Sequence, residues 1–144
     1  MDIDLERIRN HFLKDRFATG IGIAIDSVAE DCVVCSLELN ESHRNSVGGV
    51  QGGAIFTLAD LAFAVHCNLA MVCGGDVGAT LGQSCSISFL KGTRGRRLTA
   101  KSTCVSKGRS MSVYRVSVED ELGVQIAEML ANGFTVAKPF EKNA

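Results

Sequence analysis

The sequence predicts an α+β fold in which an antiparallel sheet wraps around one long buried helix. The first observation is a segment, residues 52–72, that would be apolar on nearly every side of a helix. The second is that the chain beyond residue 77 alternates as strands do, with turn residues between the alternating segments. The third is size, because 144 residues with 46% apolar side chains can bury a substantial core. We therefore expect residues 1–144 to form a single domain.

Before the long helix, we expect one helix and two strands. Apolar residues recur at helical spacing among charged ones over residues 2–14, which predicts a short amphipathic helix. Residues 20–28 are apolar and rich in β-branched side chains, and residues 33–39 alternate, so both segments are predicted strands. A polar loop over residues 40–50 then leads into the long helix.

Four strands are predicted after the long helix, separated by turns rich in glycine and charged residues. They span residues 81–89, 97–106, 111–119 and 123–137. The pair Asn132-Gly133 usually marks a tight hairpin, but too little chain follows for another full strand, so we expect a bulge there. Residues 138–144 are expected to form a flexible tail.

Charge and hydropathy exclude several classes of function. The net charge is −1, which argues against a nucleic-acid-binding protein. No apolar run approaches the roughly 20 residues that span a bilayer. The chain also begins without the basic-then-apolar order of a signal peptide. We therefore expect a cytoplasmic protein with no membrane or nucleic-acid partner.

The six cysteines are expected to be reduced thiols. Cys32 and Cys35 have C-x-x-C spacing, but side chains alternate in a strand, so their sulfurs should point to opposite faces. The other four lie in apolar stretches: Cys67, Cys73, Cys85 and Cys104. No set of side chains has the spacing of metal ligands. We expect small core residues, a reducing compartment, and neither a metal nor another cofactor.

The most informative stretch is residues 45–62, where a polar, glycine-rich loop enters the apolar helix. Backbone N–H groups without a helical partner gather at a helix start, together with partial positive charge. Asp60 is the one carboxylate in the apolar helical segment, and desolvating a carboxylate is unfavourable unless it has a partner or a task. An electrophilic backbone site near Gly52 and an isolated carboxylate together indicate attack on a carbonyl group.

The spacing of Gly52 and Asp60 is too large for both to contact one carbonyl within one chain. They are eight residues apart, which at about 1.5 Å per residue is about 12 Å along a helix. Either they serve different purposes, or the site joins Gly52 of one chain to Asp60 of another. A two-fold dimer with antiparallel helices would do the latter and would form two equal sites. The dimer is our working hypothesis.

The loop and helix contain the pattern His43-Arg44-Asn45-x-x-Gly48-x-x-Gln51-Gly52-Gly53-x-x-Phe56-x-Leu58-Ala59-Asp60. This pattern closely resembles the signature of the PaaI-like acyl-CoA thioesterases, which have the hotdog fold. The resemblance continues through Ile87-Ser88-Phe89-Leu90-Lys91 and covers about residues 15–137.

The resemblance implies hydrolysis of an acyl-coenzyme A thioester, with a short or aromatic acyl group favoured. It implies that Asp60 is the nucleophile or the general base, that the Gly52 N–H donates to the thioester oxygen, and that Asn45 helps hold the carbonyl or the water. It also implies sites between subunits, in a homodimer or a dimer of dimers.

Two positions depart from the family pattern. Gln51 stands where the family usually has His; glutamine can position a substrate but cannot shuttle a proton near neutral pH. Gly82 falls where the family has a hydroxyl-bearing residue, with Thr80 and Ser84 nearby. The residues expected to contact substrate are Gln51, Gly53, Phe56, Phe63 and His43; His43 would orient Asn45 or else be exposed in the loop.

Basic residues are concentrated in the second half of the chain, and no acidic residue occurs between Val77 and Val118. Cations at two predicted turns could bind the phosphates of coenzyme A, or could be a solvated rim of the sheet. These candidates are Arg94, Arg96, Arg97, Lys107 and Arg109.

Two rival functions are compatible with the same fold. A hydratase or dehydratase of acyl-CoA needs a His working with an acidic residue, and Gln51 counts against it. A non-enzymatic module that binds acyl-CoA would not need Asp60.

Overall fold

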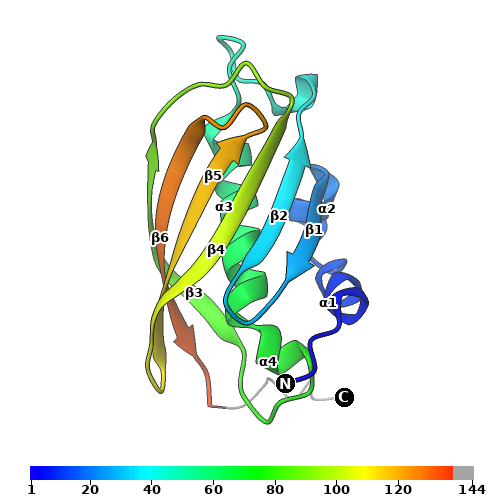
Figure 1. Cartoon of the computed structure of the whole chain (residues 1–144), viewed down its shortest axis with the longest axis vertical. Coiled ribbons are helices and arrows are strands. Elements are labelled where there is room, and N and C mark those ends of the chain that lie inside the picture. The colour runs from blue at the N-terminus through cyan, green and yellow to red at the C-terminus, as the bar shows by residue number, and fades with distance from the viewer. Residues whose placement is uncertain (138–144) are drawn as a thin grey trace.

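Six antiparallel strands form one sheet whose inner face packs on helix α3, as the computed structural model shows for residues 1–137 (Figure 1). The strand order is β1-β2-β4-β5-β6-β3. The predicted architecture, an antiparallel sheet around one long helix, is confirmed. The elements are α1 (Leu5–Phe12), α2 (Arg16–Gly20), β1 (Ile23–Val28), β2 (Val33–Glu38), the 3-10 helix η1 (Glu41–His43), α3 (Gly52–Cys67), α4 (Leu69–Val72), β3 (Thr80–Phe89), β4 (Arg97–Lys107), β5 (Met111–Asp120) and β6 (Gln125–Thr135). The tail predicted at residues 138–144 lies outside the described residues.

The N-terminal segment forms two helices where one was predicted. Asp4 Oδ1 accepts hydrogen bonds from Glu6 N at 3.0 Å and Arg7 N at 3.3 Å and so caps α1. Asp15 Oδ1 accepts one from Ala18 N at 3.0 Å and starts α2. This second cap carries the helix to Gly20, so the first strand begins at Ile23 and not at residue 20.

Helix α3 is buried on most sides, as its composition predicts, with Leu58, Ala59 and Ala62 fully buried. The predicted helix over residues 52–72 is interrupted at Asn68. Asn68 Nδ2 donates to Thr80 O at 3.0 Å, and Thr80 N donates to Asn68 Oδ1 at 2.8 Å. These bonds divide the helix because they fix its end to the first residue of β3.

The two edges of the sheet differ in exposure. At the β1 edge, α1 packs nearby and Arg9 Nε donates to Ile25 O at 2.9 Å, which blocks further strand pairing. Strand β3, at the other edge, is exposed along nearly its whole length, although it carries large apolar side chains such as Leu81 and Phe89. An unprotected apolar edge strand is a surface suited to a partner strand.

The irregularity predicted near Asn132-Gly133 lies in the neighbouring strand. β3 and β6 change register between Gly82 and Ser84, so Gln83 is the extra residue opposite Gly133 and Asn132. A Cβ on Gly133 would lie 2.7 Å from Thr80 Cγ2 and 2.9 Å from Ser112 Oγ. Gly133 is therefore required by close packing across the sheet, and the pair does not form a hairpin turn.

All six cysteines are free thiols, and the expectation that they are core residues is right for the buried Cys35 and in part for Cys67 and Cys73, which pack against the core. Cys85 and Cys104 are exposed and the other three are half-buried. Cys85 is exposed because it lies on edge strand β3, and Cys104 lies next to the register shift in β4.

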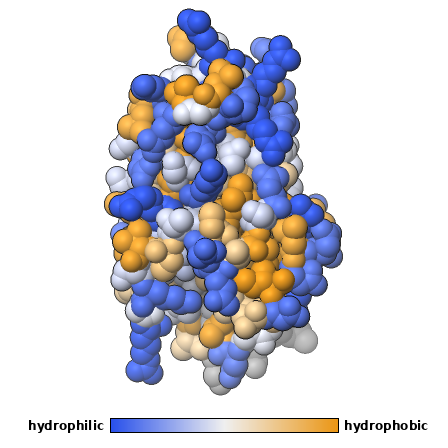
Figure 2. Space-filling view, viewed as in Figure 1, coloured by the Kyte–Doolittle hydropathy of each residue, from blue (hydrophilic) through white to orange (hydrophobic). Residues whose placement is uncertain are grey.

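The outer face of the sheet mixes hydrophilic and hydrophobic residues (Figure 2). Alternation along β5 places Ser112, Tyr114, Val116 and Val118 on the buried side. Within residues 1–137, no helix has both the length and the apolar character needed to cross a membrane.

Candidate active site

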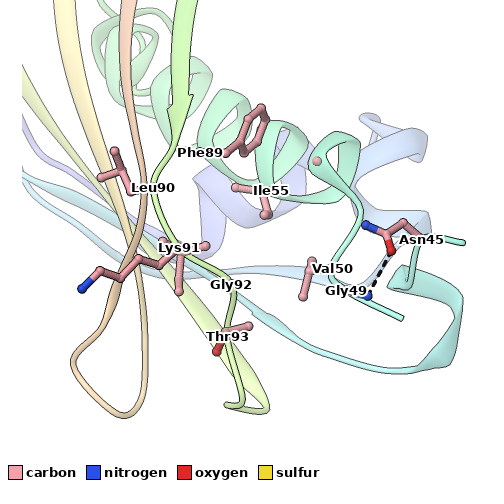
Figure 3. Close-up of a pocket in the computed structure, with 11 residues that line it drawn as sticks. Asn45, Gly49, Val50, Ile55, Phe89, Leu90, Lys91, Gly92 and Thr93 are labelled. Atoms are coloured by element: carbon pink, nitrogen blue, oxygen red, sulfur yellow. Dashed lines mark hydrogen bonds between the residues drawn. The ribbon is translucent and has the colours of Figure 1, made fainter. Parts of the chain in front are cut away.

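Asn45 organises the loop that precedes α3. Its Oδ1 accepts hydrogen bonds from Val47 N at 3.1 Å and Gly49 N at 3.0 Å, while Asn45 N donates to Gly49 O at 2.8 Å. Figure 3 shows the bond from Gly49 to the Asn45 side chain. Because the amide oxygen is engaged by backbone donors, the orientation of the amide is fixed, and its NH₂ group is left to donate elsewhere.

Gly52 is the first residue of α3, where the backbone N–H groups have no partner within the helix. Its N–H donates to the side-chain oxygen of Gln51 at 3.1 Å. A Cβ on Gly52 would lie 3.3 Å from Phe89 Cζ, so the glycine allows the Phe89 ring to pack against the helix start.

Asn45 and Gly52 line one pocket of about 420 Å³ (Figure 3). Val50 and Ile55 lie on the same side of it, and the segment that follows β3 forms the opposite wall. We call this the Gly52 pocket. The wall residues are Leu90, Lys91, Gly92 and Thr93, and Phe89 at the end of β3 lines the pocket beside them.

Asp60 lies in a second pocket, of about 590 Å³, which we call the Asp60 pocket. Helix α3 contributes Phe56, Asp60 and Phe63, and residues 80–85 of β3 form the facing side. Within residues 1–137, the Asp60 carboxylate has neither a hydrogen bond nor an ion pair. Burial raises the pKa of Asp60, and the negative charge of Asp15 raises it further. An unpaired carboxylate that faces a pocket is available to react.

The two pockets are separate within one chain. Gly52 and Asp60 belong to the same α-helix, so their eight-residue spacing puts them about 12 Å apart along its axis. Along β3, the Asp60 pocket uses residues 80–85, whereas the Gly52 pocket uses Phe89 and the residues after it. One chain does not bring the backbone donor and the carboxylate together.

His43 neither bonds the Asn45 side chain nor is exposed in the loop. It is only 3% exposed, its Nδ1 accepts from Asn40 N at 3.1 Å, and its Nε2 bonds Ile21 O at 2.6 Å. It lines neither pocket, because it caps η1 and joins that turn to the end of α2. The expectation that it orients Asn45 or is exposed is therefore wrong.

The other predicted substrate contacts divide between the pockets. Phe56 and Phe63 line the Asp60 pocket, and Phe63 packs edge-on against Tyr114 with ring centroids 5.5 Å apart. Gln51 and Gly53 are exposed at the start of α3 and do not line either pocket in this conformation.

The predicted phosphate-binding cations do not form one group. Arg97 is engaged with two carboxylates, Glu38 at 2.9 Å and Asp26 at 3.5 Å. Lys107 and Arg109 line a small pocket of about 110 Å³ that shares Thr80 with the Asp60 pocket. The remaining two, Arg94 and Arg96, are exposed in the segment that follows the wall of the Gly52 pocket.

The sequence did not indicate that residues 89–91 or Gln83 line a pocket. Both hydroxyls of β3 in the Asp60 pocket have a partner within residues 1–137, because Thr80 Oγ1 bonds Thr135 Oγ1 at 2.8 Å and Ser84 Oγ accepts from Asn132 Nδ2 at 2.8 Å. Gln83, the bulged residue, is a polar side chain that lines this pocket. Gly82 was the signal in the sequence that could have indicated Gln83, because a glycine where the family has a hydroxyl leaves the polar role to a neighbouring side chain. No metal-binding cluster occurs among residues 1–137.

A hotdog sheet, a glycine-started helix and a carboxylate facing a pocket are the features that we expect of a thioester hydrolase. The sequence profile of the thioesterase superfamily matches residues 48–127, and the chain belongs to that superfamily.

Sequence and structure comparisons agree with this assignment. The acyl-coenzyme A thioesterase PaaI of Escherichia coli is 31% identical over 108 residues, which are 74% of this chain and 73% of that protein. A thioesterase structure from Haemophilus influenzae superposes with a TM-score of 0.86 at 17% identity, covering 100% of this chain and 97% of the other. A Streptococcus mutans protein bound to acetyl-CoA superposes with a TM-score of 0.72 at 23% identity, covering 83% of this chain and 92% of the other. The alignments with curated relatives span between 66% and 80% of the relatives' own lengths.

Proposed function

We propose that this protein hydrolyses the thioester of an acyl-coenzyme A to a free acid and coenzyme A, at sites formed between two copies of the chain. The observation that carries the proposal is the Asp60 carboxylate, which has no partner among residues 1–137 and faces one pocket while the donors Gly52 N–H and Asn45 NH₂ lie at another. The relative PaaI of Escherichia coli, named as an acyl-coenzyme A thioesterase, supports the choice of substrate.

The donors would polarise the thioester carbonyl. The Gly52 N–H and the Asn45 Nδ2 group would both donate to the oxygen as negative charge develops on it. One such donor typically contributes about 2.7–4 kcal/mol to the transition state. The side chain of Gln51 has to leave Gly52 N before the substrate oxygen can bind there.

Asp60 would supply the attack on the carbonyl. Its carboxylate either attacks the carbonyl carbon directly or takes a proton from the attacking water. Both routes need the ionised form, so the raised pKa limits activity on the acid side. The leaving coenzyme A thiolate is a good leaving group and needs little acid assistance.

Pairing through β3 would assemble the complete site. A two-fold axis normal to the sheet would place two β3 strands antiparallel, so that residues 80–85 of one copy lie beside the residue-89 end of the other. The Asp60 pocket of one copy would then meet the Gly52 pocket of its partner. The exposed, apolar β3 edge supports this contact, because the opposite edge of the sheet is blocked by Arg9. A dimer of dimers is the larger assembly that we propose from the family resemblance.

The phosphates of coenzyme A would bind at the cations around the composite site. Lys107 and Arg109 line a small pocket that shares Thr80 with the Asp60 pocket. Arg94 and Arg96 come directly after the wall of the Gly52 pocket in the chain. Arg97 is a weaker candidate because two carboxylates already neutralise it. A short or aromatic acyl group would lie against Phe56 and Phe63.

The hydratase alternative lacks a histidine in the right place. His43 and His66 are buried and have both ring nitrogens engaged, and His11 lies on α1. No histidine lines the Gly52 pocket or the Asp60 pocket.

The six free cysteines support a cytoplasmic location.

Thiol release from a panel of acyl-coenzyme A substrates, followed with a chromogenic thiol reagent, tests the function. The panel would contain acetyl-, hexanoyl- and phenylacetyl-CoA. We expect Asp60→Asn to abolish release while the dimer persists in light scattering, and Asp76→Asn, at an exposed carboxylate before β3, to keep full activity. Full activity in Asp60→Asn would overturn the proposed mechanism, and no release by the wild type from any member would overturn the proposed substrate class.

A further inference from the structure

The turn between β5 and β6 fixes the segment between β3 and β4 through a buried carboxylate. Asp120 is 4% exposed. Its Oδ2 accepts a hydrogen bond from Thr93 Oγ1 at 2.6 Å, and its Oδ1 accepts from Leu122 N at 3.0 Å and Val124 N at 2.9 Å. One carboxylate thus holds its own turn and the hydroxyl of Thr93.

A second carboxylate, that of Glu121, binds the backbone of the same segment. It accepts hydrogen bonds from Arg96 N at 2.7 Å and from Arg97 N at 2.7 Å. A Cβ at position 95 would overlap the Glu121 carboxylate, so glycine there leaves room for that side chain. Gly95 N in turn donates to Thr93 Oγ1 at 2.8 Å, so the residue that bonds Asp120 also fixes the backbone just before Arg96.

The segment held in this way is one wall of the Gly52 pocket. Residues 90–93 line that pocket, and Leu90 N donates to Ile126 O at 2.8 Å, so both ends of the wall depend on the region around the β5–β6 turn. Figure 3 shows Gly92 and Thr93 at the end of this wall away from Phe89. Neither Asp120 nor Glu121 lines the pocket.

We propose that Asp120 and Glu121 are positioning residues for the thioester substrate, which they serve by holding the wall at residues 90–93 against the donors Asn45 and Gly52. The proposal rests on the proposed function. The two carboxylates act through Thr93 and through the backbone of Arg96 and Arg97, and they do not touch the substrate. Their removal therefore weakens substrate binding while the chemical step, which depends on Asp60 and Gly52, continues.

Three consecutive acidic residues provide a matched set of variants: Glu119→Gln, Asp120→Asn and Glu121→Ala. Glu119 pairs with Lys101 at 3.0 Å and makes no contact with the wall, so its variant controls for the loss of a negative charge at this place. We expect Asp120→Asn and Glu121→Ala to raise KM for acyl-coenzyme A about 3- to 10-fold, the effect of about one typical net hydrogen bond, with kcat within about two-fold of the wild type. Glu119→Gln should match the wild type in both constants.

Coupling to Thr93 separates positioning from general stabilisation. Thr93→Val removes the hydroxyl that Asp120 binds, so it should raise KM and leave kcat unchanged. The KM of the double variant Thr93→Val/Asp120→Asn should be no higher than that of the more affected single variant. Effects that multiply in the double variant would overturn the proposal. A wild-type KM in Asp120→Asn and Glu121→Ala, whatever their melting temperatures, would also overturn it, as would a fall in kcat at constant KM.

Two further measurements keep the test decisive. If Asp120→Asn does not fold, Thr93→Val and Gly95→Ala replace it in the test, with the same expected rise in KM. Gly95→Ala serves this purpose because the added methyl group displaces the Glu121 carboxylate. Binding of coenzyme A itself, measured by calorimetry, requires no turnover. Weaker binding in Asp120→Asn than in Glu119→Gln would support the positioning role even if the wild type hydrolyses none of the panel, and equal binding in the two variants would contradict it.

Discussion

At the scale of single residues, the Gly52 pocket contains a donor of fixed orientation and the Asp60 pocket contains a free carboxylate. The oxygen of the Asn45 amide is held by two backbone N–H groups, so its NH₂ group has one orientation before any ligand arrives. Asp60 has no such partner within residues 1–137 and is partly removed from water. Donors fixed in advance and a carboxylate without competing bonds are the arrangement that acyl transfer requires.

Asp60→Asn should make the folded protein more stable at neutral pH. The folded-state pKa of Asp60 is raised by burial, so folding disfavours its charged form, and the stability associated with the neutral form is lost as pH rises through that pKa. Thermal melts at pH 7 should give a higher Tm for the variant, and the difference should vanish below about pH 4, where Asp is neutral in both states. A lower Tm for Asp60→Asn at pH 7 would mean that the carboxylate makes a stabilising contact.

Gln51→Ala should lower KM for the thioester substrate. The Gln51 side chain occupies the Gly52 N–H that the substrate oxygen needs, so its removal takes away an internal competitor. Steady-state kinetics should give a KM lower by about two- to five-fold, which corresponds to one modest hydrogen bond, with kcat unchanged. A large fall in kcat would instead identify Gln51 as a donor to the transition state.

Sequence reasoning placed Asn45, Gly52 and Asp60 at pockets but placed His43 wrongly. The loop-and-helix motif is local, so residue chemistry indicated Gly52 and Asp60, and the resemblance to the thioesterase signature added Asn45. The partner of His43 Nε2 is the carbonyl of Ile21, which is 22 residues away, and nothing in the local pattern indicates that contact. Asp120 and Glu121 escaped notice for the same reason, since Thr93 and Arg96 are more than 20 residues from them.

At the scale of elements, hydrophobic periodicity predicts which elements exist, and side-chain caps decide where they end. Helix α3 and the six strands follow the alternation and apolar runs of the sequence. The boundaries at α2 and Asn68 differ because Asp15 and Asn68 form hydrogen bonds that propensity does not register. Cys85 is exposed because β3 is an edge strand, which the order of elements along the chain does not reveal.

Gly133→Ala should destabilise the sheet by about 1–3 kcal/mol, the usual range for overpacking. The added methyl group would meet Thr80 Cγ2 and Ser112 Oγ on two neighbouring strands. Chemical denaturation should detect this loss, while Gly20→Ala, where a Cβ meets nothing within 4 Å, should change stability by less than about 0.5 kcal/mol. Equal stability of both variants would contradict the packing role of Gly133.

At the scale of the whole molecule, the sheet has one blocked edge and one open edge. Arg9 covers a carbonyl of β1, whereas β3 presents exposed apolar side chains between the two pockets. The open edge, the separation of about 12 Å between Gly52 and Asp60 along α3 and the position of each pocket at one end of β3 all favour a site completed by a second copy. A single sequence could suggest this arrangement through spacing but could not identify the edge that pairs.

Activity of a purified heterodimer tests this composite site most directly. One chain would carry Asp60→Asn and the other Asn45→Asp, which keeps the oxygen that holds the loop but removes the NH₂ donor. Each homodimer should be inactive, but the heterodimer should keep about half of the wild-type activity, because one of its two equivalent sites joins an intact Asn45 to an intact Asp60. A heterodimer without activity would show that Asn45 and Asp60 must come from the same chain, and the shared site would be refuted.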